Sequence, residues 1–437
     1  MAGQPNILWI VTTQWRAQAL GYAGDANALT PWLDGLAGEA VNYTQAVTPH
    51  PLGPQARAAL LTGRLCPENG VSDYWDPLPV YEAEKNGGAA LTFRSGAPSG
   101  RALPGRTVAH ALNDRGYVTA FFGKWHLAPR DRSAPLVGEA HAKKIVPPER
   151  RGGFGLWEGF ESGFLLNDPW LHGTRLPQPK HFKGYQADVL AERAGAWGRE
   201  QGARRSGTGQ PWFCVVSLEA PHPPYHAPAP HVFEMKPSEL TLRGNVPPGG
   251  PVERQAREEL VGYYAHIEAT DRAIGKLLAE VDLAETIVVF TSVHGDMHGS
   301  HGLFRKAWPY EESVRVPLLV RYPPGKTPNA IGQTPNITSN DPVSLVDLPH
   351  MAVAWAEGNE WRCRRDSALI SMPSATEIPL QCPVAWRGFR SAKHKLVLNS
   401  KGRPWLYFDL ERDPLEMKNL AEDPARAAEI AELVRLM

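Results

Sequence analysis

The sequence of 437 residues has little cysteine, no net charge and no long hydrophobic run, and each lack narrows its interpretation. The four cysteines lie far apart without a CxxC pair, so free thiols are expected rather than a zinc knuckle. Lysine plus arginine equals aspartate plus glutamate at 46 each, which gives no reason to expect a nucleic acid or a membrane surface as partner. No apolar segment is long enough to span a bilayer. The cysteines are Cys66, Cys214, Cys363 and Cys382.

The amino-terminal stretch lacks the features of a secretion signal. The apolar run in MAGQPNILWIVTTQW is too short for a signal core, and no basic residue precedes it. We therefore expect a reduced protein of the cytoplasm. Because the formal charge is zero, any binding of an anion has to come from a local cluster of cations.

A nucleophile is also missing from the stretch TPHPLGPQARAALLTGR, residues 48–64. Its second half, RAALLTGR, is typical of a helix beside an active site, and we expect this helix to start at Arg57. Its first half has no cysteine or serine where such a helix would carry a nucleophile. The stretch therefore predicts either an enzyme that has lost its catalytic activity or one whose mechanism does not use this nucleophile.

Expected strands and helices alternate along most of the chain. This order predicts an α/β fold with a large, mostly parallel sheet sandwiched by helices. We expect buried strands at 6–11, 118–123, 212–220, 286–292 and 317–323, and helices at 30–40, 106–116 and 256–281.

The rhythm changes near residue 360. Residues 383–410 alternate like hairpin strands, and a final helix is expected at 424–437. We predict one α/β domain at 1–365 and a small antiparallel α+β subdomain at 366–437. Two segments, near 77–105 and 128–160, are expected to be long loop insertions at the mouth of a pocket.

Polar residues follow the expected strands at their carboxyl ends, where α/β sheets bind ligands. Cations and imidazoles gathered there suit a tetrahedral oxyanion. Each cation alone is more often a solvated surface residue, and each histidine alone is more often a structural one, so the set of residues leaves both interpretations open. The residues concerned are Arg57, Lys124, His126, His222, His294, Asp296 and Lys306.

Ordered motifs from Asn6 to about Ala421 resemble the sulfatase family of the alkaline phosphatase superfamily, which includes arylsulfatases and phosphonate monoester hydrolases. The resemblance implies an alkaline phosphatase-like fold for nearly the whole chain. The motifs are PNILWIVTTQ, RAALLTGR, GYVTAFFGKWHL, APHPPYHAP, TIVVFTSVHGDMHGSHGL, KAWPYEESVRVPLLVRYP and LYFDLERDPLEMKNLA.

The resemblance also implies a site. In the family, a cysteine or serine in a CxPxR-like pattern becomes formylglycine, and a divalent cation polarises this nucleophile and the substrate oxygens. Lysine, histidine and arginine bind the remaining oxygens and protonate the leaving group. The matching positions imply that Arg57, Lys124, His126, His222 and Lys306 retain these roles. For an enzyme that reuses the pocket, we expect Arg57, Lys124 and Lys306 to bind the substrate. His126, His222 or His294 would then be the catalytic acid or base, with Asp296 orienting one of them.

This sequence departs from the family at the nucleophile and at the metal. Counting back from Arg57, the nucleophile position is Gly53, which cannot become an aldehyde. The opening loop, which usually carries one or two aspartates, has Thr13 and Gln14, and the later DHG motif reads VHG, with Val293. Without carboxylates, a divalent cation among lysines and arginines lacks balancing charge. We therefore predict no metal, no cofactor and no formylglycine-dependent activity.

Two functions follow. The first is a divergent hydrolase-like enzyme that acts on a small molecule bearing a sulfate, phosphate, phosphonate or sulfonate group. The second is a non-catalytic homologue that binds an anionic ligand or serves as a structural partner. The polar loop HGDMHGSHG favours the first. A homo-oligomer stays open, as does a relocated metal site formed by Glu219, His222, His294 and Asp296.

Overall fold

The computed structural model describes residues 3–82, 105–326, 337–435 and 437. A ten-stranded mixed sheet runs through it in the order β10-β2-β9-β8-β1-β7-β3-β4-β5-β6. Its centre is parallel and consists of β8 (Thr286–Ser292), β1 (Asn6–Thr12), β7 (Trp212–Ser217) and β3 (Val118–Lys124). The predicted α/β class with a mostly parallel sheet is therefore confirmed.

Shorter strands extend both edges of this sheet. On one side, β9 (Leu318–Arg321) runs antiparallel to both β8 and β2 (Val41–Tyr43), and β10 (Ile337–Ser339) pairs with β2. On the other side, β4 (Leu156–Phe160) pairs in parallel with β3. The antiparallel β5 (Trp170–Gly173) and β6 (Lys180–His181) complete that edge.

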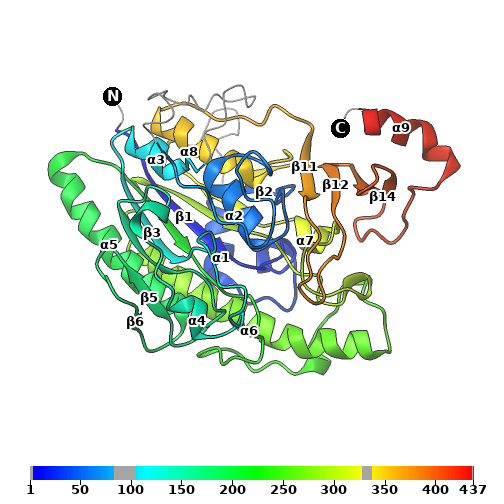
Figure 1. Ribbon diagram of the computed structural model, residues 1–437, viewed down its shortest axis with the longest axis horizontal. Coiled ribbons are helices and arrows are strands. Elements are labelled where there is room, and N and C mark those ends of the chain that lie inside the picture. Colours follow the sequence, from blue (N-terminus) through cyan, green and yellow to red (C-terminus); the bar gives the residue numbers. More distant parts are fainter. Residues whose placement is uncertain (1–2, 83–104, 327–336, 436) are drawn as a thin grey trace.

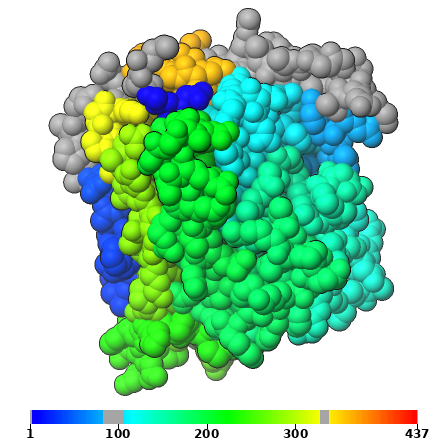
Figure 2. Space-filling view, turned by 90° about the vertical axis from the view of Figure 1, so that its left-hand side faces the viewer, coloured from blue at the N-terminus to red at the C-terminus, as the bar shows by residue number. Residues whose placement is uncertain are grey.

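Helices cover both faces of the large sheet (Figure 1). Alternate side chains of β1 point to opposite faces, as the pleat requires. Ile7, Trp9 and Val11 pack in the core that includes α2 (Gly53–Thr62), α3 (Val108–Asn113) and α8 (Leu348–Ala356). Leu8 and Ile10 pack in the core that includes α1 (Pro31–Gly38), α5 (Gln186–Thr208) and α6 (Pro251–Ala279). Figure 2 shows that cyan-to-green segments, α5 among them, form most of one side of the molecule.

A second sheet of four antiparallel strands follows in the carboxyl-terminal part, at the right of Figure 1. It docks beside the loops of the large sheet, because its apolar side chains form one cluster with Leu52, Ala307 and Val314. Trp386 Nε1 also donates a hydrogen bond to the carbonyl of Ala307 at 2.9 Å. The elements are β11 (Ser367–Met372), β12 (Trp386–Ser391), β13 (His394–Asn399), β14 (Pro404–Asp409) and α9 (Ala427–Arg435).

Two expectations need correction, and two helices were not predicted. The helix expected to start at Arg57 begins one turn earlier, at Gly53, with Pro54 in its first turn. The insertion expected at 128–160 contains the short helix α4 (Glu139–Ala142) and ends in β4, a strand of the large sheet. Neither α5 nor α8 was predicted; the buried positions of α5 are largely small residues that give no apolar rhythm.

Two further expectations concern the insertion at 77–105 and segments that could span a membrane. Most of the insertion expected at 77–105 lies outside the described residues, since 83–104 are not among them. Within the described parts of the chain, no helix combines the length and the apolar character needed to cross a membrane.

Candidate active site

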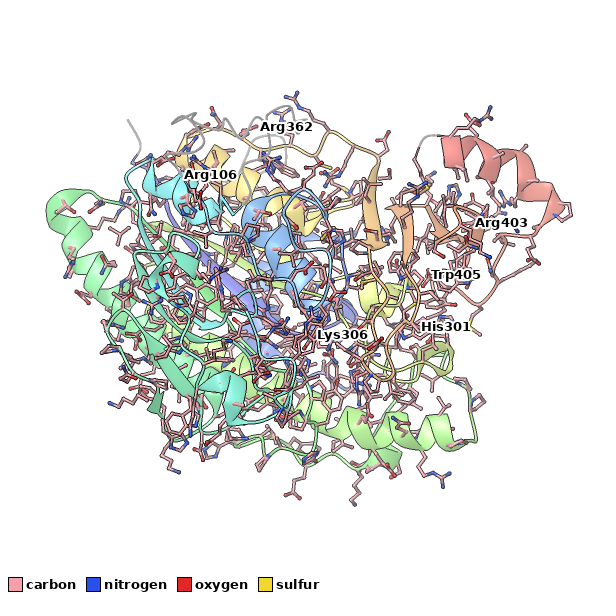
Figure 3. The ribbon with its side chains drawn as sticks, viewed as in Figure 1. Arg106, His301, Lys306, Arg362, Arg403 and Trp405 are labelled. Carbon is pink, nitrogen blue, oxygen red and sulfur yellow. The ribbon has the colours of Figure 1, made fainter. Side chains whose placement is uncertain are left out.

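A cavity of about 220 Å³ opens at the carboxyl ends of the central strands. Its walls come from both sheets, because Ile378, Pro379 and Gln381 of the carboxyl-terminal part join loops that follow β1, β3, β7 and β8. Lys306, labelled in Figure 3, lies near the middle of the molecule. Predicted site residues that line the cavity are Thr13, Gly53, Lys124, His126, His222, His294 and Lys306.

Two of the loops that follow strands adopt an uncommon backbone conformation. Gln14, just after β1, has φ of 73°, and His126, just after β3, has φ of 59°. Residues other than glycine seldom occupy this left-handed region, and those that do are concentrated at functional sites. In both loops this conformation occurs directly after a strand, at the edge of the sheet where the cavity opens.

Lys124 is a buried cation with one close carboxylate partner. Its Nζ donates to Glu219 Oε1 at 2.6 Å, and both side chains are almost fully buried. The ammonium also lies over the ring of Phe164, 4.5 Å from the centroid. Burial lowers the pKa of Lys124 to about 8, although Glu219 opposes this shift. Glu219 therefore pairs with the ammonium group of Lys124, which an anionic ligand would otherwise contact as an unpaired cation.

Lys306 connects two other loops. Its Nζ donates to Gln14 Oε1 at 2.5 Å and to His222 Nε2 at 2.9 Å. Burial lowers the pKa of Lys306 to about 7, against the opposing effect of Asp296. The two lysines thus bring two buried ammonium groups to one cavity, which suits an oxyanion.

Hydrogen bonds fix which ring nitrogen of each histidine carries its proton. Arg130 donates to His126 Nε2 at 2.6 Å, and an arginine cannot accept, so the proton of neutral His126 is on Nδ1. His126 Nδ1 is buried without a partner and lies beside Gly53. Burial, with Arg130 and Lys124, holds the pKa of His126 well below its usual range. His126 therefore presents a hydrogen-bond donor to the cavity rather than a base.

His222 and His294 have the opposite arrangement from His126. Each places Nδ1 next to a backbone carbonyl, at 2.7 Å from Pro223 and 2.9 Å from Gly295, so Nδ1–H donates and Nε2 accepts. His222 Nε2 receives the Lys306 ammonium, but His294 Nε2 is buried without a partner. Burial and Lys306 hold the pKa of both imidazoles well below its usual range. His294 is thus a neutral acceptor available to a ligand or a water.

Asp296 and Arg57, both predicted site residues, support the cavity from behind. Asp296 Oδ2 accepts from Tyr225 Oη at 2.7 Å and from the amide of Gln14, and its other oxygen accepts backbone N–H groups. Arg57 donates to Ser217 at 2.6 Å and to Thr13 at 2.7 Å. Neither is among the described residues that line the cavity. Their geometry supports positioning of other groups rather than direct contact with a ligand.

The family resemblance implies a divalent cation held at positions 13, 14, 293 and 294, but the groups present do not fit one. Val293 is apolar and fully buried. Thr13 Oγ1 donates to the carbonyl of Leu218 and accepts from Arg57, and Gln14 Oε1 already accepts from Lys306. This leaves one imidazole nitrogen and no carboxylate, whereas divalent cations in proteins take several oxygen ligands or a set of imidazole and thiolate ligands.

The residues considered for a relocated metal site, Glu219, His222, His294 and Asp296, do not form a metal-binding group among the described residues either. Among the described residues, the His and carboxylate atoms close enough to share an ion belong to His301, Glu312 and Glu416. Protein cations already occupy that group: Lys395 lies 2.6 Å from Glu416, and Arg243 lies 2.9 Å from Glu312. A divalent ion would have to displace them.

The first prediction concerns metal dependence. Treatment with EDTA, followed by addition of calcium, magnesium or manganese, is expected to leave the thermal unfolding midpoint unchanged. A resident ion at 100 times its dissociation constant would add about 2.7 kcal/mol to the free energy of unfolding, which differential scanning calorimetry detects readily. A midpoint that rises with one cation, and no longer rises in Gln14→Ala protein, would contradict the donor-set argument.

Sequence reasoning missed several residues that shape the site. Phe164 stacks on His222 with 4.4 Å between ring centroids, and Arg130 fixes the tautomer of His126. Tyr225 bonds Asp296, and Arg305 and Tyr74 line the cavity. Arg130, four residues after His126 in the chain, carried a weak signal; Phe164 and Tyr225 carried none without the fold.

Comparison with known proteins agrees with the motifs. Residues 5–358 match the family model described as Sulfatase. An ulvan-active sulfatase of Formosa agariphila is 34% identical over 446 residues, which cover 96% of this chain and 78% of that protein. An arylsulfatase of Clostridium perfringens is 24% identical over 494 residues, which cover 95% of this chain and 90% of that protein. A phosphonate monoester hydrolase of Agrobacterium radiobacter has the same fold, with a TM-score of 0.69, 21% identity, and coverage of 99% of this chain and 94% of its own. The chain belongs to the sulfatase family.

Proposed function

We propose that this protein is a divergent hydrolase of the sulfatase family that acts on a small organic molecule bearing a sulfate, phosphate, phosphonate or sulfonate group. It works without formylglycine and without a divalent metal. One observation carries the proposal: hydrogen-bond donors and an imidazole acceptor without a partner among the described residues converge on a single cavity beside Gly53. The donors are the ammonium groups of Lys124 and Lys306 and the Nδ1–H of His126, and the acceptor is His294 Nε2.

The charge of the surroundings supports an anionic ligand. Five cations surround the cavity, against four carboxylates, and burial raises the pKa of one of these, Glu161, to about 7. The relatives named above are a sulfatase active on ulvan, an arylsulfatase and a phosphonate monoester hydrolase, whose names describe anionic esters. The cations are Arg57, Lys124, Arg130, Arg305 and Lys306, and the carboxylates are Glu161, Glu219, Glu259 and Asp296.

The reaction in this proposal uses water directly. Lys124 and His126 hold the non-bridging oxygens, and His294 Nε2 takes a proton from the attacking water. As the bond from the central sulfur or phosphorus to the ester oxygen breaks, Lys306 gives that oxygen a proton. The proton on His294 then returns to Lys306 through solvent, which restores both groups. Orientation and stabilisation of charge supply most of the rate, since acid–base catalysis alone contributes about 10²–10⁴-fold.

A second candidate is binding of the same anion without turnover. The internal pairs of Lys124 with Glu219 and of Lys306 with Gln14 favour it, because they stabilise the cavity without a reaction. No cysteine or serine is among the described residues that line the cavity. The low pKa of His294 also makes its imidazole a weak base.

The test combines binding with turnover. Purified protein is incubated with 4-nitrophenyl sulfate, a phosphate diester and a phosphonate monoester in ¹⁸O-labelled water. We expect slow release of nitrophenol from one of them, with one ¹⁸O in the product anion, and a loss of about 10²-fold or more in His294→Ala protein. His181→Ala, in exposed β6, is the matched control and should keep full activity.

The outcomes separate the two candidates. Binding of a product anion such as sulfate without any turnover would support the non-catalytic homologue and reject the hydrolase. Turnover that survives in His294→Ala protein would reject the role of His294. If the protein showed no binding and no turnover, both functions would be rejected for this cavity.

A further inference from the structure

A second and larger cavity of about 410 Å³ lies on the other side of the segment that follows β1. Five parts of the chain line it. They are residues 16–26 after β1, residues 241–243 before α6, Tyr264 of α6, Glu311 and Arg315 at the two ends of α7 (Glu311–Val314), and Pro414 and Leu415 of the carboxyl-terminal part. It shares no lining residue with the first cavity. A ligand of this cavity would therefore make its own contacts.

Arg16 is the central observation in this cavity. It is only 3% exposed, and its Nη2 donates to Tyr264 Oη at 3.1 Å, but its Nε has no partner. None of the ion pairs that join described residues includes Arg16. The carboxylate of Asp25 acts on this buried cation only from beyond Tyr264, whose Oη donates to Asp25 Oδ2 at 2.6 Å. An oxyanion group that paired directly with the guanidinium would therefore reduce the cost of burying it. The cavity is the place from which such a group would reach it.

Two further arginines line the same space. Arg315 Nε is buried without a hydrogen bond and lies 3.8 Å from Glu311 Oε2, a distance too long for one. Glu311 is held more closely by Arg390 at 2.9 Å and Lys395 at 3.0 Å. Arg315 therefore has only a weak share of that carboxylate.

The other charged groups of the cavity are already engaged. Arg243 pairs through Nε with Glu312 at 2.9 Å. Asp25, the second carboxylate of the lining, accepts from Tyr264 Oη at 2.6 Å and from Asn27. The lining thus holds three arginines and two engaged carboxylates, an excess of positive charge around a solvent-accessible space.

We propose that this cavity is a binding site for an organic oxyanion, a carboxylate or sulfate group carried on a body about the size of a monosaccharide. Guanidinium groups match the planar carboxylate and the sulfate edge with paired N–H donors. Leu242, Leu415 and Tyr264 provide apolar surface for the organic body. The volume is larger than one oxyanion needs, which favours such a ligand over an inorganic ion. The proposal does not depend on the function of the first cavity.

The experiment is isothermal titration calorimetry of the full chain with D-glucuronate and D-glucose 6-sulfate, and with neutral D-glucose as control. Lys306→Ala protein is titrated in parallel, because this substitution weakens anion binding in the first cavity and leaves the second to be measured. We expect one of the two acids to bind Lys306→Ala protein and D-glucose not to bind. Arg16→Gln and Arg315→Gln, each made in Lys306→Ala protein, are expected to reduce that affinity at least 10-fold. Which acid binds more tightly distinguishes a carboxylate from a sulfate.

Several results would overturn the proposal. They are no binding of either acid to Lys306→Ala protein, equal binding of D-glucose, or unchanged affinity in both arginine variants. Because Arg16 is buried, its variant can fail to fold. The side chain of Arg315 is partly exposed, and its variant then decides the test.

Discussion

Replacing Lys306 with alanine is expected to weaken the binding of inorganic sulfate and of a sulfate ester about 10²-fold. The ammonium is buried and bonded to Gln14 and His222, so its removal takes a charge-assisted donor from the cavity and leaves two polar groups without their partner. Loss of one partner from a buried, hydrogen-bonded charged contact costs about 2–5 kcal/mol. Calorimetric titration with sulfate measures the change, and Lys183→Ala, whose side chain is 82% exposed, is the control that should bind normally.

The affinity of the native protein should also depend on pH. The pKa values of Lys306 and Lys124 are lowered to about 7 and about 8, and only the protonated forms attract an anion. Affinity is therefore expected to be highest below pH 7 and to fall as pH rises from 7 to 9. In Lys306→Ala protein the lower part of this fall should disappear. A pH-independent affinity, or sulfate binding unchanged in the variant, would contradict the assignment of Lys306 to the ligand.

Replacing Gly53 with alanine, which adds a single methyl group, is expected to lower both the stability of the protein and its affinity for sulfate. A Cβ on Gly53 would lie 2.9 Å from His126 Nδ1, closer than carbon and nitrogen tolerate. Arg130 holds that imidazole from the other side, and the ring packs edge-on against Tyr74 with centroids 5.5 Å apart, so it cannot move freely. Gly53→Ala should lower the free energy of unfolding by about 1–3 kcal/mol. It should also weaken sulfate binding by at least 10-fold, since His126 loses its position.

The matched control is Gly35→Ala. Gly35 lies in α1, and a Cβ there meets no heavy atom within 4 Å. The same change should be neutral or add about 0.5–1 kcal/mol, because alanine is a better helix former. Urea denaturation and sulfate titration of both variants provide the comparison. If Gly53→Ala were as stable as Gly35→Ala and bound sulfate normally, the contact between Gly53 and His126 would not limit the site.

Much of the candidate site could be predicted because parallel strands end at one edge of a sheet. Lys124 ends a strand, and His126, His222 and Lys306 follow strands, so the topology brings them together. Helix starts are harder to place. Arg57 was expected at the first turn of its helix, but Gly53 and Pro54 allow the helix to begin one turn earlier. Arg57 therefore lies behind the cavity and contacts Thr13.

The chemical state of the site could not be read from the sequence. Which nitrogen of His126 carries the proton depends on Arg130, and the contact of Lys306 with Gln14 joins residues 292 positions apart. The wall of the cavity that contains Ile378 depends on how the second sheet docks, which no motif encodes. The loop insertion predicted at 128–160 was wrong at its end for a similar reason, since only pairing with β3 makes residues 156–160 a strand.

The segment from Gln14 to Arg16 connects the two cavities. Gln14 bonds Lys306 in the first cavity, Arg16 lines the second, and Tyr263 Oη joins them by accepting from the Arg16 amide and donating to the Gln14 carbonyl. Thermodynamic linkage requires reciprocity: whatever factor an occupant of the second cavity applies to affinity in the first, the first occupant returns in full. Titrating one anion at saturation of the other would measure that factor from either direction.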